Sequence, residues 1–414
     1  MIVRLLKRLL FGARRDVSLL DADGEAIDET IDLSGKPLKQ GHLRKGLRDR
    51  RLVPKVLERR RGKRGSKSRY LETDEAARLF SHTQLTCNRN LRDLTADREQ
   101  LARLNLPQWQ SEQDIADALG IPLKTLWHYS IHRNMERFSH YVTFAIAKRS
   151  GGERLIMAPK SRLRAMQRQL VTLLVRQLPL HDAAHGFRRG HSIRSGADCH
   201  ARKQVVVRVD LADFFPTVHF GRVRGYLIAC GYSYPVATTL AVLMTEAERQ
   251  PVEVDGTVYH VPVTPRYCVQ GAPTSPGICN AIVRKLDNRL AGLARQFQFD
   301  YTRYADDLTF SGAEPNTVPR LLKLIGNIVE SEGFNVNAAK TRVMRKGRRQ
   351  SVTGVTVNEV IGLSRKERRK LRAALHQQKL NGVPGDCTNQ QLHGKLAYLH
   401  MLNPSQAMKL KSDC

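Results

Sequence analysis

Residues 301–311 read YTRYADDLTFS, and they place two aspartates side by side in a stretch that otherwise has the composition of a buried strand. Strands favour β-branched and aromatic residues and disfavour aspartate, and two adjacent carboxylates repel each other. A tight turn between two strands would present Asp306 and Asp307 together at one tip. Most adjacent aspartates lie in ordinary surface turns, so the pair alone does not establish a functional site.

A third aspartate ends another strand-like stretch. In KQVVVRVDL, residues 203–211, a continuous apolar run typical of a strand buried on both faces leads to Asp210. Carboxylates at a strand end, beside a strand–turn pair, can form a cage for hard divalent cations such as Mg²⁺. Two such ions about 4 Å apart can hold the attacking and leaving oxygens of a phosphoryl displacement. Their charge would offset the repulsion between Asp306 and Asp307.

The chain is strongly basic. It has 414 residues, 41% hydrophobic content, a net charge of +30 and a pI near 10.3. These values indicate a folded protein with a polyanionic partner, most often nucleic acid. Residues 36–69 hold fifteen Lys and Arg against two acids. They predict a basic segment that neutralises phosphates, although a solvated tail without a partner would have the same composition.

Cysteine usage and hydropathy indicate the compartment. Seven cysteines without a C-x-x-C pair argue against a disulfide framework and a zinc site, and fit a reducing cytoplasm. The apolar N-terminus MIVRLLKRLLF is interrupted by charges, and no other apolar run reaches 18 residues. We therefore expect an amphipathic helix at the N-terminus, a cytoplasmic protein and no membrane partner.

Helical and strand patterns alternate without a regular βαβ order, which predicts an α+β domain. Residues 111–130 have a helix–turn–helix pattern that alone would hint at DNA reading, but such pairs are common. Ser364 and Glu367 form a capping-box pattern that opens a strongly basic helix. Hairpins are predicted over 141–160, 252–263 and 299–310, and helices over 161–178, 276–298 and 318–332.

An ordered series of blocks resembles reverse transcriptases, in particular those of the bacterial retron type. The resemblance covers about residues 110–405. The blocks are similar to the family's fingers hairpin, first-aspartate strand, nucleotide loop, YxDD turn and lysine strand. They read YVTFAIAKRSGGERLIMAP (141–159), VRVDLADFFPTV (207–218), QGAPTSPGICN (270–280), YADDLTFSG (304–312) and GFNVNAAKTRVM (333–344).

The resemblance implies a right-hand polymerase with an antiparallel palm sheet, preceded by a basic, partly disordered N-terminal extension. The implied parts are an extension at 1–105, fingers at 106–205, a palm at 206–345, and a thumb with an RNA-binding C-terminal region at 346–414.

It also implies a role for residues in each block. Asp210, Asp306 and Asp307 would ligate two Mg²⁺ ions, with the Leu211 carbonyl as a further ligand. Lys148 and Arg154 would meet the triphosphate of a deoxynucleotide, unless they are ordinary solvated hairpin charges. The remaining nucleotide contacts are Phe215, which would exclude a ribose 2′-OH, Gln270 and Gly271, which would line the pocket, and Lys340, which would neutralise or protonate the leaving pyrophosphate.

Two further elements resemble the retron type. HSIRSGADCHARK supplies Ala197 and His200 of an N-A-x-x-H element, but the asparagine is replaced by Gly196. SVTGVTVNE supplies an intact V-T-G, Val352, Thr353 and Gly354. In the family this zone binds the enzyme's structured RNA; a structural histidine and an ordinary strand turn are the alternatives.

The implied function is RNA-templated synthesis of a branched RNA-linked DNA from a dedicated non-coding RNA. Deoxynucleotides, that RNA and its DNA product are the expected partners, together with a separate effector protein in anti-phage defence. Two alternatives stay open: another bacterial reverse transcriptase class, such as a group II-like or abortive-infection enzyme, or a non-catalytic RNA-binding scaffold on the same fold.

Overall fold

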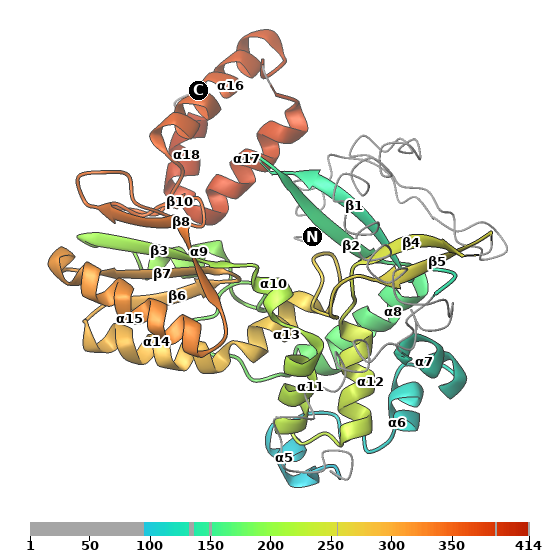
Figure 1. Cartoon of the computed structure of the whole chain (residues 1–414). Coiled ribbons are helices and arrows are strands. Elements are labelled where there is room, and N and C mark those ends of the chain that lie inside the picture. The colour runs from blue at the N-terminus through green and yellow to red at the C-terminus, as the bar shows by residue number, and fades with distance from the viewer. Residues whose placement is uncertain (1–94, 132–135, 149–150, 255, 386, 413–414) are drawn as a thin grey trace, which may run out of the picture. The chain divides into compact units, whose positions relative to one another are not determined.

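The computed structural model describes residues 95–131, 136–148, 151–254, 256–385 and 387–412 (Figure 1). Most of the predicted basic extension and the amphipathic N-terminal helix lie outside these ranges. By internal contacts the chain divides into two compact units. One runs to Leu178 and includes Val218–Ile278, and the other comprises Pro179–Thr217 and Cys279–Cys414. The boundaries of fingers, palm and thumb stay predictions.

The first unit contains two antiparallel hairpins and a set of helices. The first hairpin reverses at Gly151 and Gly152, whose φ angles of +85° and +76° suit residues without a Cβ. The hairpins are β1 (Tyr141–Ala147) with β2 (Glu153–Pro159), and β4 (Arg249–Val254) with β5 (Thr257–Pro262). The helices are α5 (Arg98–Arg103), α6 (Glu112–Ala118), α7 (Leu123–Ser130), α8 (Ser161–Leu170), α11 (Phe220–Ala229) and α12 (Tyr234–Met244).

The helix predicted over 161–178 is shorter and less regular than expected. α8 ends at Leu170, and a π-helical turn, Val171–Val175, continues it. Val171 and Thr172 are both β-branched, and the Thr172 hydroxyl donates to the Arg168 carbonyl at 3.3 Å. Such back-bonding competes with the regular ladder of the helix.

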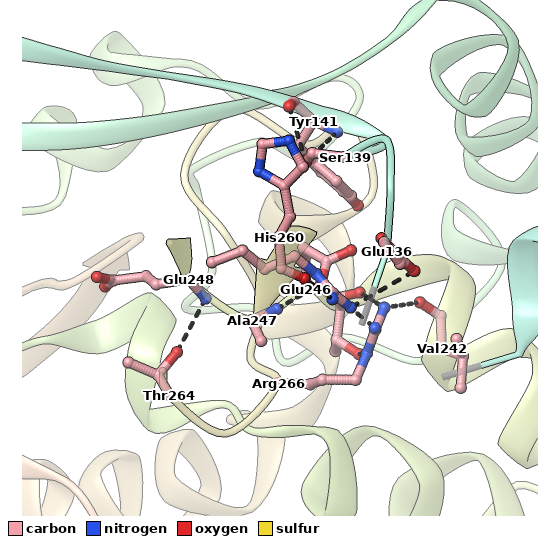
Figure 2. A network of polar contacts seen from close by, with 12 residues as sticks. Glu136, Ser139, Tyr141, Val242, Glu246, Ala247, Glu248, His260, Thr264 and Arg266 are labelled. Carbon is pink, nitrogen blue, oxygen red and sulfur yellow. Dashed lines mark hydrogen bonds and ion pairs between the residues drawn. The ribbon is translucent and has the colours of Figure 1, made fainter. Parts of the chain in front are cut away.

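A buried ion-pair network joins the second hairpin to the end of α12 (Figure 2). Glu246 lies 3.2 Å from Arg249 Nε and 3.3 Å from Arg266 Nη1, and Glu136 lies 3.6 Å from Arg249 Nη2. Burial alone would raise the pKa of Glu246, but the two guanidiniums outweigh it and hold that pKa below its usual range. The network fixes the root of the hairpin.

The second unit is built on a four-stranded antiparallel sheet in the order β6–β7–β3–β8. β3 pairs with β7 on one side and with β8 on the other, so it is a central strand. The strands are β3 (Val205–Ala212), β6 (Asp300–Tyr304), β7 (Asp307–Gly312) and β8 (Asn335–Arg345). The predicted α+β class with an antiparallel sheet is confirmed.

Two helices, α14 (Arg284–Gln296) and α15 (Val318–Ser331), lie side by side along this sheet (Figure 1). Along β3, Val207 and Val209 are buried whereas Arg208 and Asp210 are only partly so. Successive strand residues point to opposite faces, so the apolar face packs on the helices and the charged residues occupy the other face.

The predicted helix over 276–298 is two helices. α13 (Ser275–Ile282) and α14 are separated by Val283, whose ψ of 4° lies outside the helical range. The bend lies between Asn280 and Asp287, and both of these side chains hydrogen-bond to Arg303.

The C-terminal region of the second unit is a short hairpin followed by helices. α16 begins with the predicted capping box, in which Ser364 and Glu367 bond reciprocally. Its elements are β9 (Ser351–Val352), β10 (Val355–Thr356), α16 (Arg365–Asn381), α17 (Asn389–Leu402) and α18 (Pro404–Ser412). Within the described ranges, no helix combines the length and apolarity needed to cross a membrane.

Candidate active site

The structure brings Asp210, Asp306 and Asp307 together at one end of the sheet. Asp307 opens β7, and its Cα partner on β3 is Asp210. Asp306 lies in the turn before it, where its carbonyl accepts the Leu211 N–H at 2.9 Å. The turn is the tight one that the sequence predicts, because Tyr304 and Asp307 are paired residues.

The turn has a strained backbone, and hydrogen bonds from the buried Arg303 hold it in place. Ala305 has φ of +56°, a left-handed conformation that costs a residue with a Cβ free energy. Arg303 is fully buried; it donates to the Ala305 carbonyl at 3.1 Å and makes two bonds to Asp287, at 2.8 and 2.7 Å. It also donates to Asn280 Oδ1 at 2.7 Å, and the Asn280 amide donates to the Gly186 carbonyl at 2.6 Å.

The sequence analysis did not predict the pair of Arg303 and Asp287. Two features of the sequence could have indicated it: an arginine inside YTRY, a stretch predicted as buried strand, and an aspartate among the apolar positions of the preceding helix. A buried charge needs a buried partner. The side chains of Arg303 and Asp287 are both 0% exposed, so the removal of either one would leave the other as an unpaired buried charge.

Two cations neutralise part of the carboxylate cluster. Arg208 makes a bidentate pair with Asp307, with Nε–Oδ1 at 3.2 Å and Nη2–Oδ2 at 2.5 Å. Lys340 Nζ donates to both oxygens of Asp210, at 3.1 and 2.9 Å. Lys340 lies where the register of β8 against β3 shifts, between the pairs Arg208–Arg342 and Asp210–Asn337.

Negative charge nevertheless remains in excess. Burial raises the pKa of Asp306, and the neighbouring Asp210 and Asp307 raise it further. Burial also raises the pKa of Asp307, against the lowering effect of Arg208. Three carboxylates against two cations therefore leave a site that favours added positive charge.

This donor set fits a hard divalent cation. Carboxylates at the end of a sheet, with room for water and phosphate oxygens, are the ligands that Mg²⁺ takes. In the part of the chain that the structure describes, no group of three or more His, Cys, Asp and Glu has the arrangement of a formed metal site. Asp210 and Asp307 are instead engaged by Lys340 and Arg208, whose positive charges oppose the binding of a further cation to the same carboxylates.

The predicted nucleotide contacts fall in both units. In the first, Lys148 and Arg154 are exposed on either side of the glycine turn of β1–β2. The Gln270 carbonyl accepts the Met157 N–H of β2 at 2.8 Å. Gly271 follows with φ of +119°, and a Cβ there would lie 2.6 Å from the Met157 carbonyl oxygen.

In the second unit, Phe215 lies in the short helix α10 (Phe214–Thr217), just after β3. Its ring is partly exposed and meets Phe214 edge-on, with 5.4 Å between centroids. Phe214 is buried and stacks on Phe334. The core residue is thus Phe214, whereas Phe215 stays partly exposed.

The five predicted RNA contacts divide by burial. Ala197, of helix α9 (Ile193–Asp198), and Val352 are buried in one apolar cluster. Thr353 and Gly354 form the two-residue turn between β9 and β10, with φ of +46° and +87°, and are accessible. His200 is 0% exposed, and its Nδ1 and Nε2 each lie 2.7 Å from a hydroxyl, of Ser311 and Thr302.

Because of this difference in burial, only some of these residues are accessible to an RNA. The side chains of Ala197, His200 and Val352 cannot touch an RNA in this arrangement, and they would act by holding the Thr353–Gly354 turn and its neighbours in place. The RNA-binding role of the group stays a prediction.

Carboxylates on a central antiparallel strand and its neighbouring turn, with a lysine on the next strand, are the groups that a nucleotidyl-transfer enzyme of the polymerase class requires. A family model described as reverse transcriptase (RNA-dependent DNA polymerase) matches residues 146–364, and the chain belongs to this family.

Its relatives narrow the assignment. Retron Mx65 reverse transcriptase of Myxococcus xanthus is 57% identical over 394 residues, which cover 94% of this chain and 91% of that protein. Retron Mx162 reverse transcriptase of the same organism is 44% identical over 328 residues, 75% and 67% of the two chains. Retron Ec86 reverse transcriptase of Escherichia coli is 29% identical over 280 residues, 67% and 80%. The chain is a retron-type reverse transcriptase, an RNA-directed DNA polymerase.

Proposed function

We propose that this enzyme copies a dedicated non-coding RNA into single-stranded DNA that stays joined to the RNA through a branch. The observation that carries the chemistry is the register of β3 and β7, which pairs Asp210 with Asp307 beside Asp306. The retron relatives support the choice of template class. We further propose that the product acts in the cytoplasm in anti-phage defence, with a separate effector protein.

The site residues would divide the work as follows. Asp210, Asp306 and Asp307 would hold two Mg²⁺ ions, with the Leu211 carbonyl as an additional ligand. When bound, these ions supply the charge that activates the attacking oxygen and stabilises the leaving one.

The flanking residues would bind and orient the nucleotide. Lys148 and Arg154 would bind the triphosphate, Gln270 and Gly271 would form the pocket wall, and Phe215 would exclude a ribose 2′-OH. Lys340, which bonds Asp210 in this structure, carries an ammonium proton that it could give to the leaving pyrophosphate.

The test replaces both turn aspartates by asparagine, which keeps their shape and removes their charge. We expect Asp306→Asn with Asp307→Asn to lower primer extension by about a thousandfold or more, the scale of losing preorganised charge stabilisation. RNA binding should persist, because the turn is held by Arg303 rather than by the carboxylates. The readouts are radiolabelled primer extension and filter binding of the same RNA.

Asp300→Asn is the matched control. Asp300 lies at the far end of β6 from the turn and pairs with Lys203, so its loss should leave extension within about twofold. Undiminished extension in the double asparagine variant would exclude these carboxylates as the catalytic centre. Sequencing of co-purified nucleic acid separates the retron proposal from another reverse transcriptase class, since only the former predicts a branched RNA–DNA molecule.

A further inference from the structure

Arg208 is a charged residue in the central strand of the sheet. It lies two positions before Asp210 on β3, on the same face, in a run whose other members are valines. Its guanidinium reaches diagonally to Asp307 on β7 and engages both carboxylate oxygens. Both side chains are shielded, at 31% and 14% exposure. Solvent therefore screens this pair less than it would a surface ion pair.

The pair occupies both oxygens of a proposed metal ligand. Each Asp307 oxygen keeps a second lone pair, so an ion that binds it either shares the oxygen with the guanidinium, against the repulsion of that charge, or displaces the N–H···O bond. Arginine suits this position because its planar fork matches a carboxylate and its charge cannot be lost by deprotonation. Lys340 engages Asp210 through a single ammonium group and is 57% exposed, so it can leave more easily.

We propose that Arg208 is a built-in counter-cation of the active site, which holds Asp307 in the metal-free enzyme and sets the divalent cation concentration at which the site fills. The inference rests on the proposed function, since it concerns the same carboxylates. Arg208 does not touch the reacting atoms in this assignment; it acts through Asp307 as a positioning residue.

The experiment measures binding of Mn²⁺ alone to the full-length protein by the loss of the free-ion electron paramagnetic resonance signal, without nucleotide or RNA. Arg208→Gln removes the charge and keeps a side chain of similar length. We expect the Mn²⁺ dissociation constant to fall about tenfold, because one opposite charge in contact typically shifts the ionic equilibrium of a carboxylate by one to three logarithmic units. Arg208→Lys keeps the charge but loses the bidentate fork, so its Mn²⁺ dissociation constant should lie between those of the wild type and of Arg208→Gln.

Arg342→Gln is the matched control. Arg342 is the Cα partner of Arg208 on β8, it is exposed, and its guanidinium bonds the Thr341 carbonyl rather than an active-site carboxylate. The Arg342→Gln variant loses the same unit charge, but on the neighbouring strand, so its Mn²⁺ affinity should stay within about twofold of that of the wild type. Thermal unfolding in EDTA verifies that each variant folds, and Arg208→Met, which retains the aliphatic volume, replaces Arg208→Gln if the latter does not.

Unchanged or weaker Mn²⁺ binding in Arg208→Gln would overturn the inference, and so would equal tightening in Arg342→Gln. Failure of the proposed function would look different. In that case the wild type would show no Mn²⁺ binding that Asp306→Asn with Asp307→Asn removes, whatever the Arg208 variants do.

Discussion

At the scale of single residues, His200 illustrates a polar group that the core satisfies completely. One ring nitrogen of a neutral imidazole donates and the other accepts, and the hydroxyls of Ser311 and Thr302 can serve either role. Burial is the main cause that lowers the pKa of His200 to about 3, with Lys203 nearby and Asp300 acting in the opposite sense. The side chain is therefore neutral in the folded protein throughout the physiological range.

This burial predicts a pH-dependent stability. The unfolded chain binds a proton at His200 with a pKa of about 6.5, whereas the folded chain resists protonation until about pH 3, so the unfolded state gains protons first as pH falls. Stability contributed by His200 is present above pH 6.5 and is lost below it, by about 2 kcal/mol at pH 5. Urea unfolding at pH 7 and pH 5 measures the loss.

His200→Gln should make stability less dependent on pH over this interval, even though it lowers stability at both values. Exposed His376, on α16, provides the control, since His376→Gln should keep the wild-type slope. A His200→Gln slope equal to that of the wild type would mean that the buried imidazole takes up a proton over the same pH range in the native and unfolded states.

Residue types were informative where the chemistry needs a rare group. The adjacent aspartates alone did not establish a site, but together with Asp210 at the end of an apolar run they predicted the carboxylate cluster that β3 and the β6–β7 turn bring together. Their partners were not identifiable. Arg208 and Arg303 look alike in sequence, since each is an arginine inside an apolar strand. In the structure Arg208 engages the carboxylate of Asp307, whereas Arg303 supports the turn from within the core. Only the register of the strands separates the two.

At the scale of elements, the hairpins and the helix over 318–332 formed where the sequence predicts them, whereas the other two long helices are interrupted. Glycine and aspartate turns mark strand ends locally, and β1–β2 and β6–β7 formed where predicted. The helices over 161–178 and 276–298 departed from continuous helix at Val171 and Val283. Those interruptions accompany contacts with distant parts of the fold. For example, Asn280 and Asp287, on either side of Val283, both bond Arg303, and hydrophobic periodicity does not indicate such contacts.

Gly271 carries the element-scale prediction. The loop that contains it lies against β2, and a Cβ at Gly271 would overlap the Met157 carbonyl oxygen at 2.6 Å and crowd Ile156. We expect Gly271→Ala to destabilise the protein by about 2–3 kcal/mol and to disturb the bond between Met157 N–H and Gln270. If the loop lines the nucleotide pocket, KM for deoxynucleotides should rise more than kcat falls.

Gly120 separates backbone strain from overlap. It has φ of +64°, but a Cβ there would meet no atom within 4 Å, so Gly120→Ala should cost only about 1 kcal/mol and leave KM unchanged. Equal losses of stability for the two substitutions, by denaturant unfolding, would contradict the contact argument.

At the scale of the whole molecule, charge is the property that composition establishes without any structure. The net charge of +30 is far larger than the two positive charges, on Arg208 and Lys340, that pair with active-site carboxylates. In the described region, α16 has six Arg or Lys among its residues 365–372. A nucleic-acid enzyme uses such charge to displace counterions from phosphates, which gives affinity without sequence preference. Specific recognition then has to come from elsewhere, and Thr353 and Gly354 are accessible candidates.

The basic segment 36–69 predicts the largest salt effect in the chain. It lies outside the described residues, so the argument rests on composition alone: fifteen cations and two acids, a net +13 of the total +30. If about five of those cations meet RNA phosphates, deletion of 36–69 should lower the slope of log affinity against log salt by about four. Deletion of 1–35 is the control, because it removes a similar length that carries five cations and seven acids. Fluorescence anisotropy of the cognate RNA between 50 and 300 mM salt, about the range in which counterion release is linear, measures both slopes. An unchanged slope after deletion of 36–69, with affinity intact, would mean that this charge stays in solvent, and the basic face of α16 would then have to supply the phosphate contacts.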